Sequence, residues 1–378
     1  MKHKQLSHRI LREIKEEVDK CIGCKKCMEN CPMLNEYCTN PKELLNKTVE
    51  EGKIDSQVPY SCALCGYCTQ VCPTKVDLQK SFLEIRKFIV EENNGIPKEI
   101  NHKAVKFHQR NSFSKLFATA YEGKAKGNQK TIFFPGCSLT AYSPEIVMKV
   151  YEYLQRQIGD IGIIAKCCGN PTYTMGDLAL FKKYYDSLQS DIDRMEISEV
   201  ITACQNCFQT IKKHSPKVRV TSLWEVIAKI GIPQSTIEET QKIPVTFALH
   251  DPCPTRNEVQ IHEAIRKILE DMELKIEELQ FSKEKTLCCG SGAMIGVTNH
   301  GLATQQMKKR AEQAKSDYIL TYCQECVWSM RRGGKKSIHI LDLIFNKQIY
   351  ERLDQEESST LNKWMNRYRG RRKIDRLK

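Results

Sequence analysis

One cysteine run occurs twice near the start of the chain, and this repetition constrains the fold more than any other feature. Residues 21–32 read CIGCKKCMENCP and residues 62–73 read CALCGYCTQVCP, so both have the spacing C-x2-C-x2-C-x3-C-P. The chain of 378 residues holds 19 cysteines in all. The first residues are charged and no apolar run reaches membrane length, so we expect a cytoplasmic protein. In a reducing compartment, dense cysteine indicates metal ligation rather than disulfides.

This spacing is the one that bacterial ferredoxins use to hold [4Fe–4S] clusters. Three cysteines wrap a tight loop around one cubane, and the fourth, followed by proline, reaches the other cluster. Structural zinc closes with four ligands and has no use for two copies of a four-cysteine run, so zinc is the weaker alternative. We therefore predict two [4Fe–4S] cubanes, held by Cys21, Cys24, Cys27 and Cys72, and by Cys62, Cys65, Cys68 and Cys31.

The rest of the chain is a tandem repeat with five cysteines in each unit. The matching segments are TIFFPGC (131–137) with VTFALHDPC (245–253), KCCGNP (166–171) with LCCGSG (287–292), and VITACQNC (200–207) with ILTYCQEC (319–326). Each unit has a single cysteine, an adjacent pair and a C-x2-C pair. The candidate metal ligands are Cys137, Cys167, Cys168, Cys204 and Cys207 in the first unit, and Cys253, Cys288, Cys289, Cys323 and Cys326 in the second.

Short β-rich runs end at these cysteines and are followed by helical patterns. Strands are predicted at 131–134, 200–203 and 319–322, and helices at 144–157, 176–193 and 300–315. Strands that alternate with helices favour an α/β sheet whose ligands lie at the carboxyl ends of the strands. Gly169 and Gly290 follow the adjacent cysteines and would let the backbone turn close to neighbouring irons.

The two motif types together resemble the CCG-domain iron–sulfur family, and with the fused ferredoxin-like part the chain is similar to the catalytic subunit of heterodisulfide reductase. The resemblance implies that each CCG domain carries a noncubane [4Fe–4S] cluster on its five cysteines. It also implies that the two clusters face one another and that a disulfide is cleaved between them. Cys168 and Cys289 would then belong to the catalytic site. His250, close to Cys253, is a further candidate that could protonate a product thiolate, although a histidine at a strand end is the plainer interpretation.

The expected fold is multi-domain, with an N-terminal α-helical ferredoxin-like domain followed by two tandem α/β CCG domains. Apolar stripes at helical spacing support helices in the first domain, and eight basic residues against one acidic residue mark the segment from Lys363 to Lys378. The expected boundaries are 1–97 for the ferredoxin-like domain, 98–130 for a linker, 131–240 and 241–350 for the CCG domains, and 351–378 for a basic C-terminal tail.

Two functions remain open. The first is a disulfide reductase that receives electrons from a flavoprotein, hydrogenase or cytochrome. The second is the electron-transfer subunit of a flavin-dependent glycerol-3-phosphate, glycolate or lactate dehydrogenase that passes electrons to quinone, with the basic tail as a peripheral membrane-docking strip. Nucleic-acid binding rests on the formal charge of +13 alone and is not expected. GSGAMIG at 290–296 has the wrong spacing for a dinucleotide loop, and Cys38 is expected to be a small buried residue.

Overall fold

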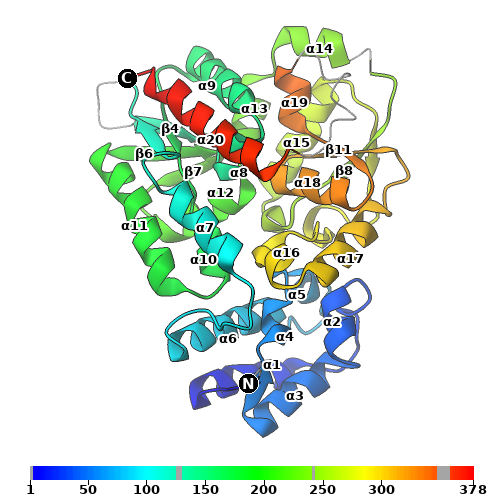
Figure 1. Cartoon of the computed structure of the whole chain (residues 1–378). Coiled ribbons are helices and arrows are strands. Elements are labelled where there is room, and N and C mark those ends of the chain that lie inside the picture. Colours follow the sequence, from blue (N-terminus) through cyan, green and yellow to red (C-terminus); the bar gives the residue numbers. More distant parts are fainter. Residues whose placement is uncertain (1–2, 125–129, 241–242, 347–357) are drawn as a thin grey trace.

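The computed structural model describes residues 3–124, 130–240, 243–346 and 358–378, and it divides into three parts (Figure 1). The ferredoxin-like domain lies at the bottom of the view, and the two CCG units lie side by side above it. Among the described residues, no helix is both long and apolar enough to cross a membrane. The chain therefore has the predicted order of one helical domain and two α/β domains.

The ferredoxin-like domain is mainly helical, with one short antiparallel strand pair that joins β1 to β2. The apolar stripes of its first and last helices are buried against each other, including Ile10, Ile14, Phe82 and Ile85. Its elements are β1 (His3–Gln5), α1 (His8–Lys20), α2 (Pro32–Tyr37), α3 (Pro41–Glu51), β2 (Lys53–Asp55), α4 (Gln57–Tyr60), α5 (Tyr67–Val71) and α6 (Leu78–Glu92).

The first CCG unit is built on a five-stranded sheet with the order β3-β5-β4-β6-β7, parallel except for β3. Helices alternate with its strands, which confirms the α/β prediction. Its elements are α7 (Lys103–Ser112), β3 (Thr119–Tyr121), β4 (Lys130–Phe134), α8 (Cys137–Tyr142), α9 (Pro144–Ile158), β5 (Gly162–Ala165), α10 (Asn170–Thr174), α11 (Leu178–Arg194), β6 (Ile197–Thr202), α12 (Gln205–His214), β7 (Arg219–Ser222) and α13 (Leu223–Ile230).

The second CCG unit has a wholly parallel sheet with the order β11-β10-β8-β9. Its elements are α14 (Gln234–Thr240), β8 (Phe247–His250), η1 (Cys253–Thr255), α15 (Val259–Asp271), β9 (Ile276–Glu278), η2 (Lys283–Lys285), η3 (Gly292–Met294), α16 (Ile295–Thr298), α17 (His300–Ala311), β10 (Tyr318–Thr321), α18 (Gln324–Arg332), β11 (Lys336–His339) and α19 (Ile340–Phe345).

Two segments differ from their expected roles. The range 98–130 was expected to be a linker, but it contributes α7 and strand β3 of the first sheet. The range 351–378 was expected to be a tail, but its described part forms α20 (Thr360–Asp375), which packs on α8, α9 and β3. Arg367 and Ile374 of this helix are buried, so α20 is part of the first CCG unit rather than a free basic strip.

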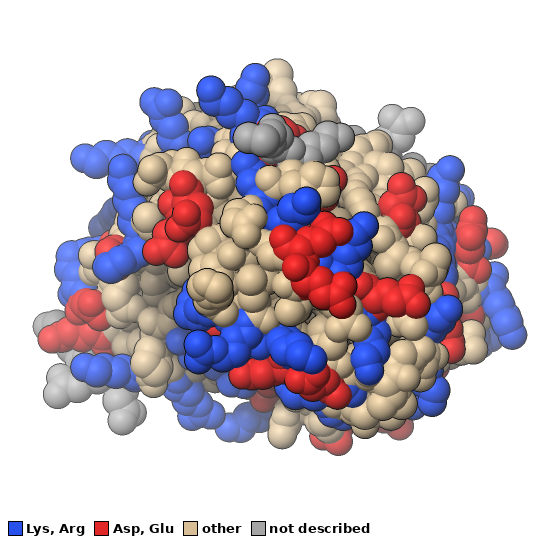
Figure 2. All heavy atoms as spheres, turned by 90° about the horizontal axis from the view of Figure 1, so that it is seen from below, with Lys and Arg blue, Asp and Glu red and all other residues tan. Residues whose placement is uncertain are grey.

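The surface is not uniformly basic despite the formal charge of +13. Figure 2 shows the molecule from below, on the side of the ferredoxin-like domain, with Lys and Arg interspersed with Asp and Glu. The face seen there is a mixed-charge surface, and no single large basic patch dominates it.

Candidate metal centres

The first cysteine run forms a cavity close to the protein surface. Its lining includes the four thiols that the sequence assigns to one cubane, Cys21, Cys24, Cys27 and Cys72, together with Cys68 of the other predicted set. Cys24 is exposed, and the neighbouring Ile22 keeps 64% of its surface accessible. Burial, together with the neighbouring thiols, raises the pKa of Cys27 to about 12, so a bound metal would have to displace its proton.

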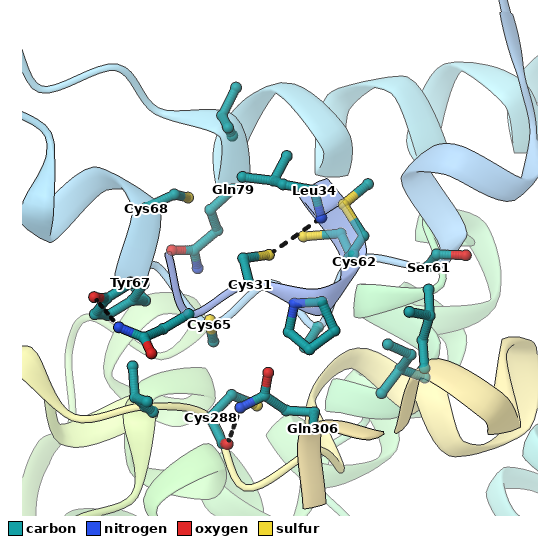
Figure 3. A pocket seen from close by; sticks show the side chains of 18 of the residues that line it. Cys31, Leu34, Ser61, Cys62, Cys65, Tyr67, Cys68, Gln79, Cys288 and Gln306 are labelled. Carbon is teal, nitrogen blue, oxygen red and sulfur yellow. Dashed lines mark hydrogen bonds between the residues drawn. The ribbon is translucent and has the colours of Figure 1, made fainter. Parts of the chain in front are cut away.

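A second cavity is lined mainly by the second cysteine run (Figure 3). Its lining includes the four thiols predicted for the second cubane, Cys31, Cys62, Cys65 and Cys68. Cys288, from the second CCG unit, lines the same cavity from the opposite side. Contact with the Cys288 thiol is the main reason that the pKa of Cys65 is raised, with burial second. Cysteines of a ferredoxin-type site and of a CCG site therefore line the same cavity.

The loop after Cys289 explains this close approach. Gly292 lies directly on the backbone of Ala63, so closely that a Cβ atom at Gly292 would collide with the Ala63 carbonyl oxygen. The GSGAMIG run to which Gly292 belongs is thus a docking loop against the second cubane loop. Arg256 strengthens the contact, because its Nε donates to the carbonyl of Cys65 at 3.2 Å and its guanidinium also donates to the carbonyl of Thr286 at 2.7 Å.

In the first CCG unit the three cysteine segments follow the adjacent parallel strands β4, β5 and β6. Their side chains contact one another as a chain, with 3.8 Å between the Sγ atoms of Cys137 and Cys167. The neighbouring thiols of Cys167 and Cys207 lower the pKa of Cys168 to about 5. The order of contacts is Cys137, Cys167, Cys168, Cys207 and Cys204.

The second unit repeats this order of contacts with its own five thiols. The single cysteine follows β8, the C-x2-C pair follows β10, and the adjacent pair comes from the loop after β9. The chain of contacts runs through Cys253, Cys288, Cys289, Cys326 and Cys323. The sequence repeat therefore corresponds to a repeated geometry.

Both CCG glycines lie where the sequence predicts a close turn of the backbone, and both have a left-handed conformation. Gly169 has φ of +82° and Gly290 has φ of +94°, in the left-handed region that favours glycine. The amide N–H of each donates back to the first cysteine of its pair, at 3.4 Å to Cys167 Sγ and 3.3 Å to Cys288 Sγ. Amides directed at cysteine sulfur suit a thiolate-bound cluster.

Two buried glutamines also fit a site that holds a further group. Gln205 and Gln324 occupy the matching positions after Cys204 and Cys323, and both side chains are almost fully buried. In the described structure the amide oxygen of each has no hydrogen-bond partner, and neither does the amide nitrogen of Gln324. Buried polar groups without partners are costly, so these amides suit sites in which another group satisfies them.

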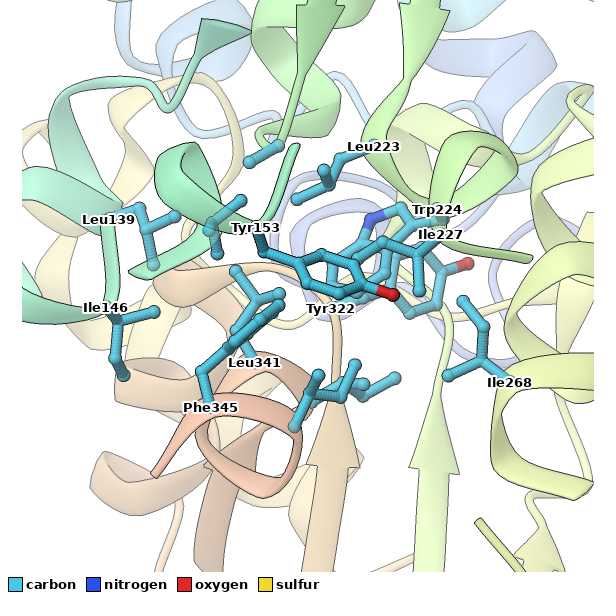
Figure 4. Packing of buried hydrophobic residues seen from close by; sticks show 14 of the residues in the cluster. Leu139, Ile146, Tyr153, Leu223, Trp224, Ile227, Ile268, Tyr322, Leu341 and Phe345 are labelled. Atoms are coloured by element: carbon cyan, nitrogen blue, oxygen red, sulfur yellow. The ribbon is translucent and has the colours of Figure 1, made fainter. Parts of the chain in front are cut away.

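The two CCG sites are neighbours across the domain interface. The helix that carries each C-x2-C pair packs on the single-cysteine segment of the other unit, α18 on α8 and α12 on η1. Gln209 Nε2 donates to the carbonyl of Pro254 at 2.8 Å, next to Cys253. Around these contacts one apolar core, including Leu139, Trp224 and Tyr322, joins both units (Figure 4). The two sites thus have a fixed mutual orientation.

The other residues that the sequence singled out have different surroundings. His250 is fully buried at the end of β8, beside Cys289 and Cys326. Cys38 is half-buried outside both ferredoxin cavities and donates its thiol to the carbonyl of Leu34 at 3.1 Å.

Sequence reasoning missed Arg86, which lies where all three domains meet. Arg86 is fully buried in α6 and donates to the carbonyl of Cys62 at 2.6 Å. Its guanidinium also donates to the carbonyl of Thr174 in the first CCG unit at 2.6 Å and to that of Ala293 in the second at 3.4 Å. Nothing in the sequence pattern distinguishes it from other basic residues of an amphipathic helix.

Comparison with known proteins agrees with this division of the chain. Residues 131–212 and 247–331 match the CCG model, described as a cysteine-rich domain. Residues 17–76 match the model described as a 4Fe-4S dicluster domain.

Several curated proteins are similar over most of the chain. An iron–sulfur protein of Methanococcus maripaludis is 25% identical over 88% of this chain and 73% of its own length. One subunit of the dihydromethanophenazine:CoB–CoM heterodisulfide reductase of Methanosarcina barkeri is 21% identical over 87% of this chain and 92% of its own. The EtfAB:quinone oxidoreductase of Syntrophomonas wolfei is 18% identical over 84% of this chain and 55% of its own.

Proposed function

We propose that this chain, an iron–sulfur oxidoreductase, takes electrons through two cubanes to a pair of CCG sites that reduce a disulfide. It consists of a 4Fe–4S dicluster domain followed by two cysteine-rich CCG domains. The proposal assigns the crossed cysteine sets of the first domain to two [4Fe–4S] cubanes. It assigns the five cysteines of each CCG unit to one further [4Fe–4S] cluster of the noncubane type. When bound, such clusters supply one-electron transfer.

The contact between Cys65 and Cys288 carries the proposal. Cys65 belongs to the second cubane set and Cys288 to the second CCG set, and the two thiols line one cavity. Electrons that reach the second cubane therefore have a short path into the second CCG site. Cys24 is the one exposed cysteine among the 19, all of which lie in the described residues, and it belongs to the first cubane set. We therefore place the entry of electrons at the first cubane.

The neighbouring CCG sites account for the number of electrons. Reducing a disulfide breaks one S–S bond and consumes two electrons and two protons to give two thiols. Two sites in fixed orientation can each deliver one electron. A single one-electron site cannot supply both electrons in one step. Cys168 and Cys289 are the proposed catalytic positions, because each lies in the middle of its chain of thiols.

The heterodisulfide reductase subunit similar to this chain supports a disulfide substrate, since its name specifies a CoB–CoM heterodisulfide. The electron donor would be a redox protein such as a flavoprotein, hydrogenase or cytochrome. We propose a thiol–disulfide substrate class and leave its identity to experiment.

A relay to quinone is the second candidate, and one observation favours it. The name of the similar Syntrophomonas wolfei protein specifies quinone as the acceptor. In this function the chain would be the electron-transfer subunit of a flavin-dependent dehydrogenase. The basic C-terminal segment supports this candidate less than the sequence suggested, because α20 is packed on the first CCG unit.

Two variants test the proposal in anaerobically prepared protein. Cys168→Ser and Cys289→Ser, made separately, should each abolish the reduction of a panel of disulfides while the electron paramagnetic resonance signals of the cubanes remain. Cys38→Ser is the matched control, because Cys38 lies outside both cavities lined by the ferredoxin cysteines, and it should behave as wild type.

Iron analysis belongs to the same experiment. We expect about sixteen irons per chain, four for each of the four clusters. Iron near eight, or stoichiometric zinc, would show that the CCG sites hold no iron–sulfur cluster. Wild-type protein that reduces no disulfide but passes electrons to quinone analogues would favour the relay.

A further inference from the structure

The second CCG site has a histidine, His250, at a strand-end position where the first has none. His250 is completely buried at the end of β8, and one of its ring nitrogens lies within 4.8 Å of the sulfur atoms of Cys289 and Cys326. The sequence repeat places Phe134 at the matching position of the first unit, also fully buried. The two sites therefore share their cysteines but differ at this position. The first site has its own N–H donor elsewhere, because Gln109 Nε2 donates to Cys167 Sγ at 3.2 Å.

Arg310 determines which nitrogen of His250 carries the proton. Arg310 Nε lies 3.0 Å from His250 Nδ1, and both side chains are fully buried. A guanidinium can only donate hydrogen bonds, so Nδ1 must be the acceptor. A ring whose Nδ1 accepts a hydrogen bond is neutral and carries its single proton on Nε2.

The Nε2 atom has no hydrogen-bond partner within the described residues, although it is buried. Arg310 is itself held in place, with its NH1 donating to Gln313 Oε1 at 2.6 Å. The ring is thus fixed in one tautomer, and its unsatisfied N–H belongs to a ring that adjoins Cys289 and Cys326. An orphaned buried donor of this kind requires an acceptor, and thiolate sulfur is the acceptor that the site offers.

We propose that His250 donates its Nε2–H to a thiolate of Cys289 or Cys326 in the loaded second site, and that this hydrogen bond raises the reduction potential of that site. Reduction adds negative charge that spreads onto the sulfur ligands, and a donor to sulfur stabilises the reduced form more than the oxidised form. Arg310 is a positioning residue that acts through the tautomer of His250.

This role differs both from the proton donor that the sequence offered as a candidate for His250 and from a plain strand-end histidine. The imidazole of His250 is neutral, fully enclosed and accepts a hydrogen bond on Nδ1. It therefore keeps its Nε2 proton near sulfur and does not deliver it to a product. The consequence is an asymmetry between the CCG sites. The second site, which adjoins the second cubane through Cys288, has an N–H donor where the first has a phenyl ring.

The inference rests on the proposed function only in requiring a cluster in the second CCG site. The test uses the full chain, loaded anaerobically, and measures the midpoint potential of each cluster in a redox titration monitored by electron paramagnetic resonance. His250→Phe copies the first site, and Arg310→Met removes the group that fixes the tautomer. Both should lower the potential of one CCG cluster while iron content stays at the wild-type level.

Two further variants separate this effect from a general disturbance of the fold. His250→Gln keeps a side-chain N–H donor and should restore part of the potential lost in His250→Phe. His339→Gln changes an equally buried histidine of the same sheet, which contacts Leu341 and Trp224, and should leave all potentials unchanged.

Labelling histidine with nitrogen-15 gives a second readout, the coupling of the histidine nitrogen to the cluster, measured by pulsed electron paramagnetic resonance. We expect a weak nitrogen coupling to one CCG cluster, which His250→Phe removes. An unchanged potential in fully loaded His250→Phe protein overturns the proposal, and so does the strong coupling of a nitrogen bonded directly to iron. Iron near eight in wild-type protein instead overturns the proposed function, and this inference with it.

Discussion

Ser138 of the first CCG unit donates a hydrogen bond to Glu325 of the second, with 2.6 Å between Ser138 Oγ and Glu325 Oε1. Ser138 follows Cys137 directly, and Glu325 lies between Cys323 and Cys326. This single bond therefore connects a ligand segment of one site to a ligand segment of the other. It helps to set the separation of the two sites, on which delivery of two electrons to one disulfide would depend under the proposed function.

Glu325→Ala should reduce disulfide turnover more strongly than it reduces stability. Loss of one hydrogen bond to a charged group costs about 1.5–3 kcal/mol, which a chain with this large shared core should tolerate. Iron content should stay at the wild-type level, and the melting temperature should fall by a few degrees. Glu325→Gln keeps an acceptor oxygen and should retain most of the activity. Equal activity in wild type and Glu325→Ala would show that this contact does not position the sites.

Gly292→Ala should slow the passage of electrons from the ferredoxin-like domain to the second CCG site. The new methyl group would collide with the Ala63 carbonyl, so the docking loop and the second cubane loop must move apart. Overpacking of this kind typically costs about 1–3 kcal/mol. Stopped-flow reduction by the physiological donor should show a slower second phase. A small dye that reduces the CCG sites directly should be unaffected.

Gly296→Ala is the matched control for this prediction. Gly296 lies only a few residues further along, and a Cβ atom there meets no atom within 4 Å. Electron transfer in Gly296→Ala protein should equal that of wild type. Similar slowing in both variants would indicate that any change in this loop disturbs the site, and the specific contact with Ala63 would lose its role.

Arg86→Met should loosen the junction of the three domains. The variant removes the buried Arg86 guanidinium, which donates hydrogen bonds to the carbonyl oxygens of Pro59, Cys62 and Thr174. Breaking a buried hydrogen-bond network of this size should cost about 3 kcal/mol or more. We expect faster proteolysis between residues 92 and 103 and a lower melting temperature. Arg110→Met, at an exposed position of α7, should change neither.

The grouping of the cysteines was predictable because their spacing is a local property of the chain. The runs at 21–32 and 62–73, and the repeat of single, paired and C-x2-C cysteines, gave the order of the domains and the strand-end location of the CCG sites. The close turn at Gly169 and Gly290 was also predictable, since each glycine directly follows two adjacent cysteines.

The contacts between domains were not predictable in this way. The meeting of Cys65 with Cys288 depends on which faces of two separate domains dock, and no periodicity in one sequence records that choice. The same holds for Arg310, which reaches His250 at the end of β8 from helix α17, and for α20. The charge of α20 suggested a solvated strip, whereas its buried Ile374 and its contacts with α8 decide its position.

Acid should destabilise the protein partly through His339, whose side chain caps α19. His339 Nδ1 accepts a hydrogen bond from the Leu341 amide at 3.1 Å, and burial lowers the pKa of His339 to about 3. An unfolded histidine has a pKa near about 6.5, so below that pH the unfolded chain binds a proton that the native chain refuses. This contribution to stability is complete above about pH 6.5 and is lost as the pH falls toward 3, at about 1.4 kcal/mol per pH unit.

His339→Asn keeps a cap acceptor but cannot take up this proton. Between pH 7.5 and 5.5 the free energy of unfolding of wild type should therefore fall by about 1.4 kcal/mol more than that of the variant. Melting curves of the loaded protein at both pH values provide the measurement, because His250 and His262 contribute equally in both proteins and cancel in the comparison. Parallel pH dependence in the two proteins would mean that His339 is protonated in the native state or exposed to solvent, and its role as a neutral buried cap would be wrong.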